Sequence, residues 1–295
     1  MGDKPSVTGS DDARSGAFTK GLPMRAALFA ISGRAEAARV EAGRARAVAA
    51  GYRLSELPAH GLSAPGQYLA GDDEVRRASL AGALAADADF LWALRGGYGA
   101  TRLSPLADFD LAGATVVGFS DVTALLAAVH AAGGRAIHGP VLTSFGAGDE
   151  ASVEAMAAAL ASRARSWALG GDSVQLSAPV IGGNTEVLSR LVGTPEAPNY
   201  AGRVVVLEEV GEPWYRSDRS LTQLLVGSDL CDAAAVVFGE FHDCPDGVAE
   251  ALAERLRGLG LPVLTGAPVG HGAANHAFVW GETAHIDGQQ MSLGG

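Results

Sequence analysis

A serine stands at the junction of two apolar segments, where its hydroxyl could act as a nucleophile. The run from Ala114 to Phe119 is typical of a buried strand, and Thr123 to Ala132 is typical of an apolar helix. Ser120 lies between them, on a sharp turn at the start of a helix whose free N–H groups favour developing negative charge. Alternatively, Ser120 only caps that helix, because Val122 replaces the second glycine of the G-x-S-x-G pattern.

A glycine-rich loop follows another apolar run, Phe90–Leu94, and reads Arg95-Gly96-Gly97-Tyr98-Gly99. Ligands of open α/β sheets bind beyond the carboxyl ends of the strands, so we expect this loop and Ser120 to share one crevice. Glycines there let backbone N–H groups approach an oxyanion or a phosphate. The pattern is neither G-x-G-x-x-G nor a P-loop, so a plain tight turn remains the alternative.

Candidate partners for the serine also occur at the ends of strand-like runs. Glu208, Glu209 and Glu212 follow one apolar run, and His138 and His271 stand beside glycine in turns. A serine nucleophile needs an imidazole to take its proton, and the imidazole needs a carboxylate to fix its tautomer. The sequence therefore permits a triad and leaves the choice among these carboxylates and histidines open.

The order of segments predicts an α/β protein with an N-terminal doubly wound, mostly parallel sheet and a smaller mixed α/β C-terminal domain. We expect a disordered leader at 1–23, an N-terminal domain at 24–150, a linker at 151–178 and a C-terminal domain at 179–295. Within these units the expected strands are 26–31, 90–94, 114–119, 203–207, 234–238 and 262–265, and the expected helices are 34–50, 72–84, 123–132, 152–165, 217–226 and 248–259. We expect 166–179 to be mixed and loop-like.

Composition narrows the class of protein. The net charge of −11 argues against nucleic-acid binding, because no Lys/Arg stripe could neutralise phosphates. Two cysteines are typical of a reducing compartment, and no apolar run is long enough for a membrane helix, so we expect a cytoplasmic protein. His242, Asp243 and Cys244 are consecutive and cannot all face one ion from a regular element, so we expect no metal and no cofactor.

Several segments together resemble the LD-carboxypeptidase family, the S66 serine peptidases. The matching stretches are LAGDDEVRRASL (69–80), RGGYGATRL (95–103), GFSDVTAL (118–125), HGP (138–140), GGNTEVLSRLVGTP (182–195), VVVLEEVGEPWYRSDRSLTQL (204–224) and PVGH (268–271). They occur in the family's order and cover residues from about 70 onward. The resemblance implies an α/β domain joined to a smaller mixed domain, often in a homodimer.

The resemblance also implies roles for particular residues. The family's nucleophile falls on Ser120, its orienting glutamate on Glu208 and its general base on His271. The family's oxyanion hole falls on the backbone N–H groups of Gly97 and Asp121.

The family hydrolyses the amide between an L-centre and a terminal D-amino acid of murein tetrapeptides. We expect a small peptide substrate bound by Arg95, Gly96 and Tyr98, with Arg95 facing its terminal carboxylate. A related branch cleaves amides that link a peptide or amino acid to a nucleotide and so confers immunity to microcins. Because the only large aromatic residues between 146 and 208 are Trp167 and Tyr200, we favour the tetrapeptide. A non-catalytic α/β module that binds a ligand's phosphate is the third alternative.

Overall fold

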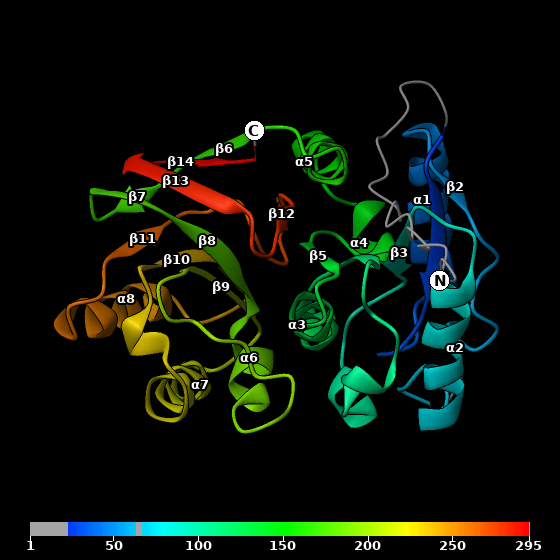
Figure 1. The fold of residues 1–295 in the computed structure, drawn as a ribbon, viewed down its shortest axis with the longest axis horizontal. Coiled ribbons are helices and arrows are strands. Elements are labelled where there is room, and N and C mark those ends of the chain that lie inside the picture. Colours follow the sequence, from blue (N-terminus) through cyan, green and yellow to red (C-terminus); the bar gives the residue numbers. More distant parts are fainter. Residues whose placement is uncertain (1–22, 63–66, 295) are drawn as a thin grey trace, which may run out of the picture.

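Two sheets lie side by side in the computed structural model, which describes residues 23–62 and 67–294 (Figure 1). Most of the expected leader, residues 1–22, lies outside the described residues. The prediction of an α/β fold is confirmed, but among the described residues the second sheet has more strands, eight against six. No helix within 23–62 and 67–294 combines the length and apolar character needed to cross a membrane.

The first sheet has the strand order β12-β5-β4-β3-β1-β2, and all its strands are parallel except β12. Its strands are β1 (Arg25–Phe29), β2 (Arg53–Leu54), β3 (Phe90–Ala93), β4 (Thr115–Gly118), β5 (Arg135–His138) and β12 (Phe278–Val279). The central strand β3 is wholly apolar and buried, and β4 is apolar and buried after its first residue, Thr115, as expected for strands covered on both faces.

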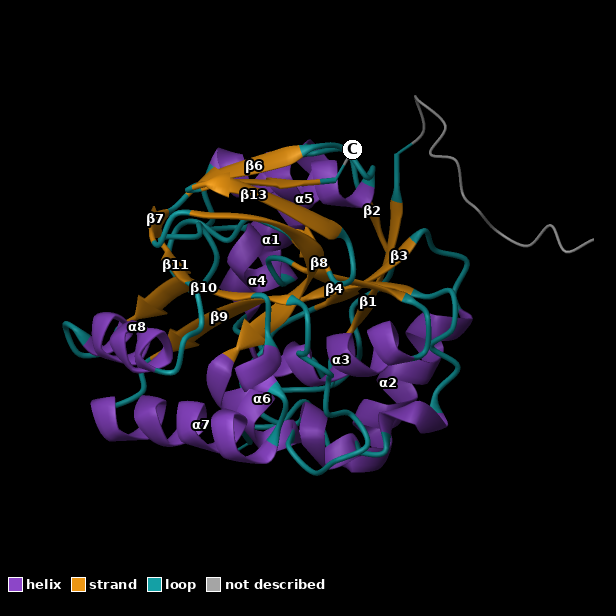
Figure 2. Ribbon diagram, turned by 60° about the vertical axis from the view of Figure 1, so that its left-hand side comes forward, coloured by secondary structure: helices purple, strands orange, loops and turns teal. Residues whose placement is uncertain are grey.

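Helices cover both faces of this sheet (Figure 2). Alternate residues of β1 belong to two buried apolar clusters, one shared with α2 and α3 and the other with α1, α4 and α5. These helices are α1 (Ala37–Ala49), α2 (Asp73–Ala85), α3 (Thr123–Ala131), α4 (Leu142–Phe145) and α5 (Glu150–Leu160). Asp72 caps α2 by accepting a hydrogen bond from the backbone N–H of Val75 at 2.8 Å, as its position predicts.

The second sheet has the order β6-β14-β13-β8-β9-β10-β11-β7, with four parallel strands, β8 to β11, flanked by antiparallel ones. Its strands are β6 (Arg165–Ala168), β7 (Gly170–Gly171), β8 (Val174–Asn184), β9 (Val204–Val210), β10 (Ala235–His242), β11 (Val263–Thr265), β13 (Thr283–Gly288) and β14 (Gln290–Leu293). Its helices are α6 (Thr185–Leu191), α7 (Trp214–Gly227) and α8 (Val248–Gly258).

The prediction of a loop-like stretch at 166–179 is wrong. That stretch contributes most of β6, all of β7 and the first part of β8 to the second sheet. Exposed residues alternate with buried ones along β6 and with partly buried ones at the start of β8, so these strands lack the apolar runs that are typical of the central strands. The expected division into domains at 24–150 and 179–295, with a linker at 151–178, stays a prediction.

The two sheets meet where α3 begins. The backbone N–H of Asn184, at the end of β8, donates to Thr123 Oγ1 at 3.3 Å. Gly183 has a φ of +157°, and a Cβ there would lie 2.7 Å from Thr123 Oγ1. Glycine at this position therefore lets the end of β8 approach the helix that follows Ser120.

Candidate active site

Ser120 has a strained backbone, with a φ of +60°. It begins a short 3₁₀ turn, Ser120–Val122, that joins the end of β4 to α3. A residue other than glycine in this left-handed region costs about 1–3 kcal/mol, and such strain persists only where the surroundings impose it. This conformation is that of a nucleophile elbow, in which the serine stands on a sharp strand-to-helix turn.

Gly96 lies directly against Ser120. A Cβ at Gly96 would be 2.9 Å from Ser120 Cβ and 3.0 Å from Ser120 Oγ. The structure therefore brings the glycine-rich loop to the serine, as the sequence predicted. It also explains why the loop has glycine at 96, because any side chain would collide with the hydroxyl.

Gly97 is enclosed from the other side by residues that the sequence did not single out. Its φ is +110°, and a Cβ there would be 2.9 Å from the hydroxyl of Tyr68. The backbone N–H of Arg34 donates to the carbonyl of Tyr68 at 2.9 Å, and Gly33 N–H donates to the carbonyl of Gly96 at 3.1 Å. These contacts join three segments around Gly97, namely the loop after β1, the loop after β3 and the segment before α2.

The side chain of Asp121 is a buried anchor for these loops. Its Oδ2 accepts hydrogen bonds from Ser32 Oγ at 2.6 Å and from the backbone N–H of Ala100 at 2.8 Å. Burial raises the pKa of Asp121, although the hydrogen bonds from Ser32 and Ala100 act in the opposite direction. The sequence predicted a role for the backbone N–H of Asp121 and missed this role of its side chain.

Arg76, which is fully buried on α2, also anchors the loops that Asp121 holds. Its Nη1 donates to the carbonyl oxygens of Ile31 and Gly99, the latter at 2.6 Å, and its Nη2 pairs with Asp73. A buried guanidinium is costly unless its donors are used. Arg76 therefore holds the ends of β1 and of the glycine-rich loop together.

Glu208 and His271 form a buried pair on the second sheet. Glu208, on β9, is fully buried, and its Oε2 lies 2.8 Å from His271 Nδ1. Because a carboxylate only accepts, Nδ1 carries the proton in this contact and Nε2 is the lone-pair nitrogen of the neutral ring. Of the three candidate carboxylates, Glu208 is therefore the one that contacts this histidine.

Electrostatics around His271 favour its protonated form. Burial by itself lowers the pKa of His271, but the charge of Glu208, its hydrogen bond, and the charges of Glu209 and Glu240 outweigh burial. The pKa of His271 is therefore raised above its ordinary value. The pair is built to stabilise an imidazolium, which is what a base needs once it has taken a proton.

Glu209 points to the opposite side of β9, as strand alternation predicts. Its carboxylate accepts from Asn184 Nδ2 and from the backbone N–H of Glu186, both at 2.9 Å, and from that of Val210 at 3.0 Å. Burial, and then the charge of Glu208, raise the pKa of Glu209 to about 7. Glu209 therefore supports the turn between β8 and α6.

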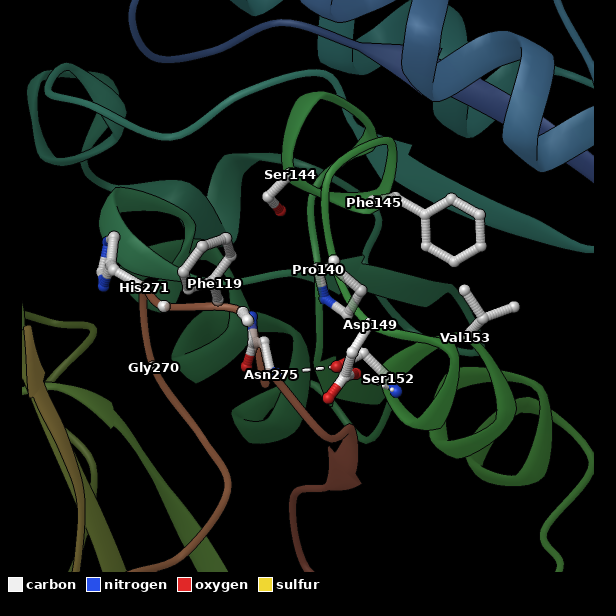
Figure 3. A pocket seen from close by; sticks show the side chains of 13 residues that line it. Phe119, Pro140, Ser144, Phe145, Asp149, Ser152, Val153, Gly270, His271 and Asn275 are labelled. Atoms are coloured by element: carbon white, nitrogen blue, oxygen red, sulfur yellow. Dashed lines mark hydrogen bonds between the residues drawn. The ribbon is translucent and has the colours of Figure 1, made fainter.

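Phe119 places His271 next to the serine turn. The rings of Phe119 and His271 lie 4.7 Å apart between centroids, and Figure 3 shows them side by side. The loop that carries His271 is tied to α5 as well, because Asn275 N–H donates to Ser152 Oγ at 2.8 Å. The histidine is thus held against the residue that directly precedes Ser120.

His138, the other histidine beside a glycine, is a core residue. It is fully buried and stacks on Phe278, with ring centroids 4.9 Å apart and an interplanar angle of 13°. Burial lowers the pKa of His138 to about 4, so the ring is neutral at pH 7. The structure thereby separates two histidines between which the residue pattern alone did not choose, and His271, the one indicated by the family resemblance, is the one that contacts a carboxylate.

Of the side chains expected to bind substrate, Arg95 makes a hydrogen bond within the protein and Tyr98 remains exposed. Arg95 is half-buried, and its Nη1 donates to the carbonyl of Arg34. Tyr98 is 50% exposed and Tyr68 is 54% exposed, whereas Trp167 and Tyr200 are buried. Tyr68 lies against Gly97 and Tyr98 follows Gly97 in the chain, so two exposed aromatic residues outside 146–208 stand at the glycine-rich loop that meets Ser120.

A serine on a strained elbow beside a buried Glu–His pair, at the edge of an α/β sheet, is an arrangement typical of serine hydrolases. Two family models match the chain, the LD-carboxypeptidase N-terminal domain over residues 26–139 and the LD-carboxypeptidase C-terminal domain over 177–286. The chain belongs to the LD-carboxypeptidase family, and the predicted class of enzyme, a serine-type carboxypeptidase, is confirmed.

Individual relatives agree with this assignment. The murein tetrapeptide carboxypeptidase of Pseudomonas aeruginosa is 36% identical over 272 residues, covering 81% of this chain and 88% of the relative. The solved muramoyltetrapeptide carboxypeptidase of Oxalobacter formigenes has a TM-score of 0.79 and 28% identity, covering 91% of this chain and 99% of that one. The microcin C7 self-immunity protein in complex with aspartyl sulfamoyl adenosine has a TM-score of 0.83 at 19% identity, covering 93% and 97%, and shares the fold.

The contact between Gly96 and Ser120 generates a prediction. In Gly96→Ala the new methyl group would press on the Ser120 hydroxyl and displace it, so labelling of Ser120 by a fluorophosphonate probe should slow by about 100-fold. Gly82→Ala is the control, because a Cβ at Gly82 on α2 meets nothing within 4 Å. Equal labelling rates of Gly96→Ala and the unmodified protein, measured by mass spectrometry, would contradict the prediction.

Proposed function

We propose that Ser120, His271 and Glu208 are the catalytic triad of a serine carboxypeptidase that releases a terminal D-amino acid from murein tetrapeptides. The observation that carries the proposal is the 2.8 Å contact between buried Glu208 and His271, beside the strained turn of Ser120. The similarity to the murein tetrapeptide carboxypeptidase of Pseudomonas aeruginosa supports the choice of substrate.

In the proposed first step Ser120 Oγ attacks the carbonyl carbon between the L-centre and the D-amino acid, and its proton passes to His271 Nε2. Glu208 holds the ring through Nδ1 and stabilises the imidazolium that forms. The negative charge on the substrate oxygen would be stabilised by the backbone N–H groups of Asp121, which follows Ser120, and of Gly97, which follows the glycine that lies against Ser120. The C–N bond then breaks, and His271 returns the proton to the leaving amine.

In the second step water attacks the acyl-enzyme ester. His271 takes a proton from the water, the new C–O bond forms, and the proton returns to Ser120 Oγ as the ester bond breaks. The products are a tripeptide and a free D-amino acid. We also propose, from the family resemblance, that the protein works as a homodimer in the cytoplasm.

A second candidate substrate is an amide between an amino acid and a nucleotide, as in microcin-type antibiotics. The observation in its favour is the pair of exposed aromatic residues, Tyr68 and Tyr98, near the serine turn, because an aromatic face could stack on a base. We rank it second, because the likeness to the microcin self-immunity protein, at 19% identity, concerns the fold.

The substrate proposal predicts release of D-alanine from an L-Lys- or diaminopimelate-D-Ala tetrapeptide, measured beside hydrolysis of an aspartyl-adenylate amide. We expect kcat/KM for the tetrapeptide to be at least about 100-fold higher, because the terminal D-residue is bound in the transition state. Ser120→Ala is the control for contaminating hydrolases. Cleavage of the nucleotide amide alone would refute this choice, and binding of both compounds without hydrolysis would favour a non-catalytic module.

The triad predicts that Ser120 and His271 act as one unit. Ser120→Ala and His271→Ala should each lower kcat by about 10⁴-fold or more, and the double variant should be no worse than either. Circular dichroism checks that each variant folds. Losses that multiply in the double variant would sink the assignment.

The orienting carboxylate can be identified in the same assay. Glu208→Gln should lower kcat by about 10³–10⁴-fold, because the amide can present its NH₂ to Nδ1 and favour the wrong tautomer. Glu209→Gln should lower kcat by less than about 10-fold and instead reduce the free energy of unfolding by about 1–3 kcal/mol, because its hydrogen bonds to the β8–α6 turn weaken. A reversed ranking in kcat would mean that the other carboxylate orients the base.

A further inference from the structure

Strand β10 carries a bulge directly opposite Glu208. The pairing of β10 with β9 runs through Phe238, opposite Leu207, and resumes at Phe241, opposite Glu209. Gly239 and Glu240 therefore face the single residue Glu208, which is the geometry of a β-bulge. Bulges re-aim side chains, and this one stands at the end of the strand beside the candidate active site.

Gly239 lets the His271 segment close onto the bulge. A Cβ at Gly239 would lie 2.3 Å from the carbonyl oxygen of Val269 and 3.3 Å from Glu208 Cβ. The first distance is shorter than any real contact of a Cβ with backbone, so only glycine fits. The bulge and the turn before His271 are therefore in direct backbone contact.

Glu240 forms hydrogen bonds with the turn on both sides of His271. Its backbone N–H donates to the carbonyl of Val269 at 2.7 Å, and its Oε2 accepts from the backbone N–H of Gly272 at 2.6 Å. A Cβ at Gly270 would lie 2.7 Å from Glu240 Cβ, and one at Gly272 would lie 2.3 Å from Glu240 Oε2. The glycines on both sides of His271 are thus explained by the approach of Glu240.

The other carboxylate oxygen of Glu240 faces His242, whose Nδ1 lies 3.0 Å from Oε1. His242 Nε2 is in turn 3.6 Å from Asp243 Oδ2. His242, whose position beside Asp243 and Cys244 argued against a metal site, therefore orients the carboxylate that holds the His271 turn.

We propose that Glu240 is a positioning residue for the general base, a role that rests on the proposed function of His271. It fixes the turn from 269 to 272 by two hydrogen bonds and adds its carboxylate charge to those of Glu208 and Glu209 around the imidazole. It touches neither the serine nor the expected position of the substrate, and acts only through His271.

The charges around His271 and Glu240 determine in which direction the loss of the Glu240 charge would shift the pKa of His271. Glu208 on β9 contacts His271, and Glu240 on β10 binds its turn, whereas Glu209 lies on the other side of β9 and acts on His271 through its charge alone. Neutral His138 lies beyond Phe119, and His242 and Asp243 face Glu240. Glu240 is one of the charges that raise the pKa of His271. Removing its charge should therefore lower that pKa, and the neutral, active base should persist to more acidic pH.

The test compares Glu240→Gln, which keeps an acceptor for Gly272 N–H and loses the charge, with Glu240→Ala, which loses both. Glu254→Gln, an exposed carboxylate on α8, is the control for the charge change. In Glu240→Gln we expect the acid limb of kcat/KM to move down by about half a pH unit. In Glu240→Ala we expect kcat to fall by about 10–100-fold with KM within about twofold, because a misplaced base slows chemistry without weakening binding.

Histidine NMR provides a readout that does not depend on activity. The resonance of His271, assigned by its absence in His271→Gln, should titrate at lower pH in Glu240→Gln than in the unmodified protein or in Glu254→Gln. An unchanged titration of His271 and an unchanged kcat in Glu240→Ala would overturn the role of Glu240. Full hydrolytic activity of Ser120→Ala would instead refute the proposed function, and the NMR comparison would still decide whether Glu240 acts on His271.

Discussion

The contact between Glu208 and His271 is the interaction on which the arrangement of the second sheet depends. A fully buried carboxylate is costly unless a hydrogen-bonding or charged partner compensates for lost hydration. His271 Nδ1, at 2.8 Å, is that partner for one oxygen of Glu208. The bulge at Gly239 and Glu240 and the glycines beside His271 all serve to bring this turn close enough for the contact.

A different constraint acts at the first sheet, because Ser120 must be kept in a backbone conformation that residues other than glycine disfavour. Ser120 has a φ of +60°, so favourable contacts among the surrounding residues must offset the free-energy cost of this conformation. The side chains of Asp121 and Arg76 contribute to this, since they hydrogen-bond with the loops after β1 and β3. Asp121 accepts from Ser32 Oγ and from the backbone N–H of Ala100, and Arg76 donates to the backbone carbonyls of both loops. These hydrogen bonds leave the glycine-rich loop little freedom to move away from the serine.

Most features that the sequence predicted are marked by residues that are neighbours along the chain. Apolar runs identified the central strands, and residue types at strand ends identified Ser120, Glu208 and His271 as candidates. The hairpin of β13 and β14 is an exception, because its signal is local and yet no strand was predicted there. Buried and exposed residues alternate in both strands, and Gly288 begins the turn between the paired residues Asp287 and Gln290. The roles of Tyr68, Glu240 and the Asp121 side chain could not be predicted, since each arises from contacts between loops far apart in sequence. The bulge at Gly239 was not predicted because the expected strand ended at 238, whereas β10 continues to His242 with a glycine inside it, which is a signal typical of a bulge.

The serine and the histidine belong to different sheets, so their relative position depends on how the sheets are joined. The segment that carries His271 begins after β11 in the second sheet and ends at β12, which pairs with β5 in the first (Figure 1). Along this path it is tied to the first half of the chain, because Asp149 N–H donates to the carbonyl of Ala273 and Asn275 N–H donates to Ser152. His271 is therefore anchored at both ends and in the middle, with Phe119 against its ring. The proposed proton transfer from Ser120 to His271 requires such anchoring at both sheets, because it tolerates only a small displacement of the proposed base from the proposed nucleophile.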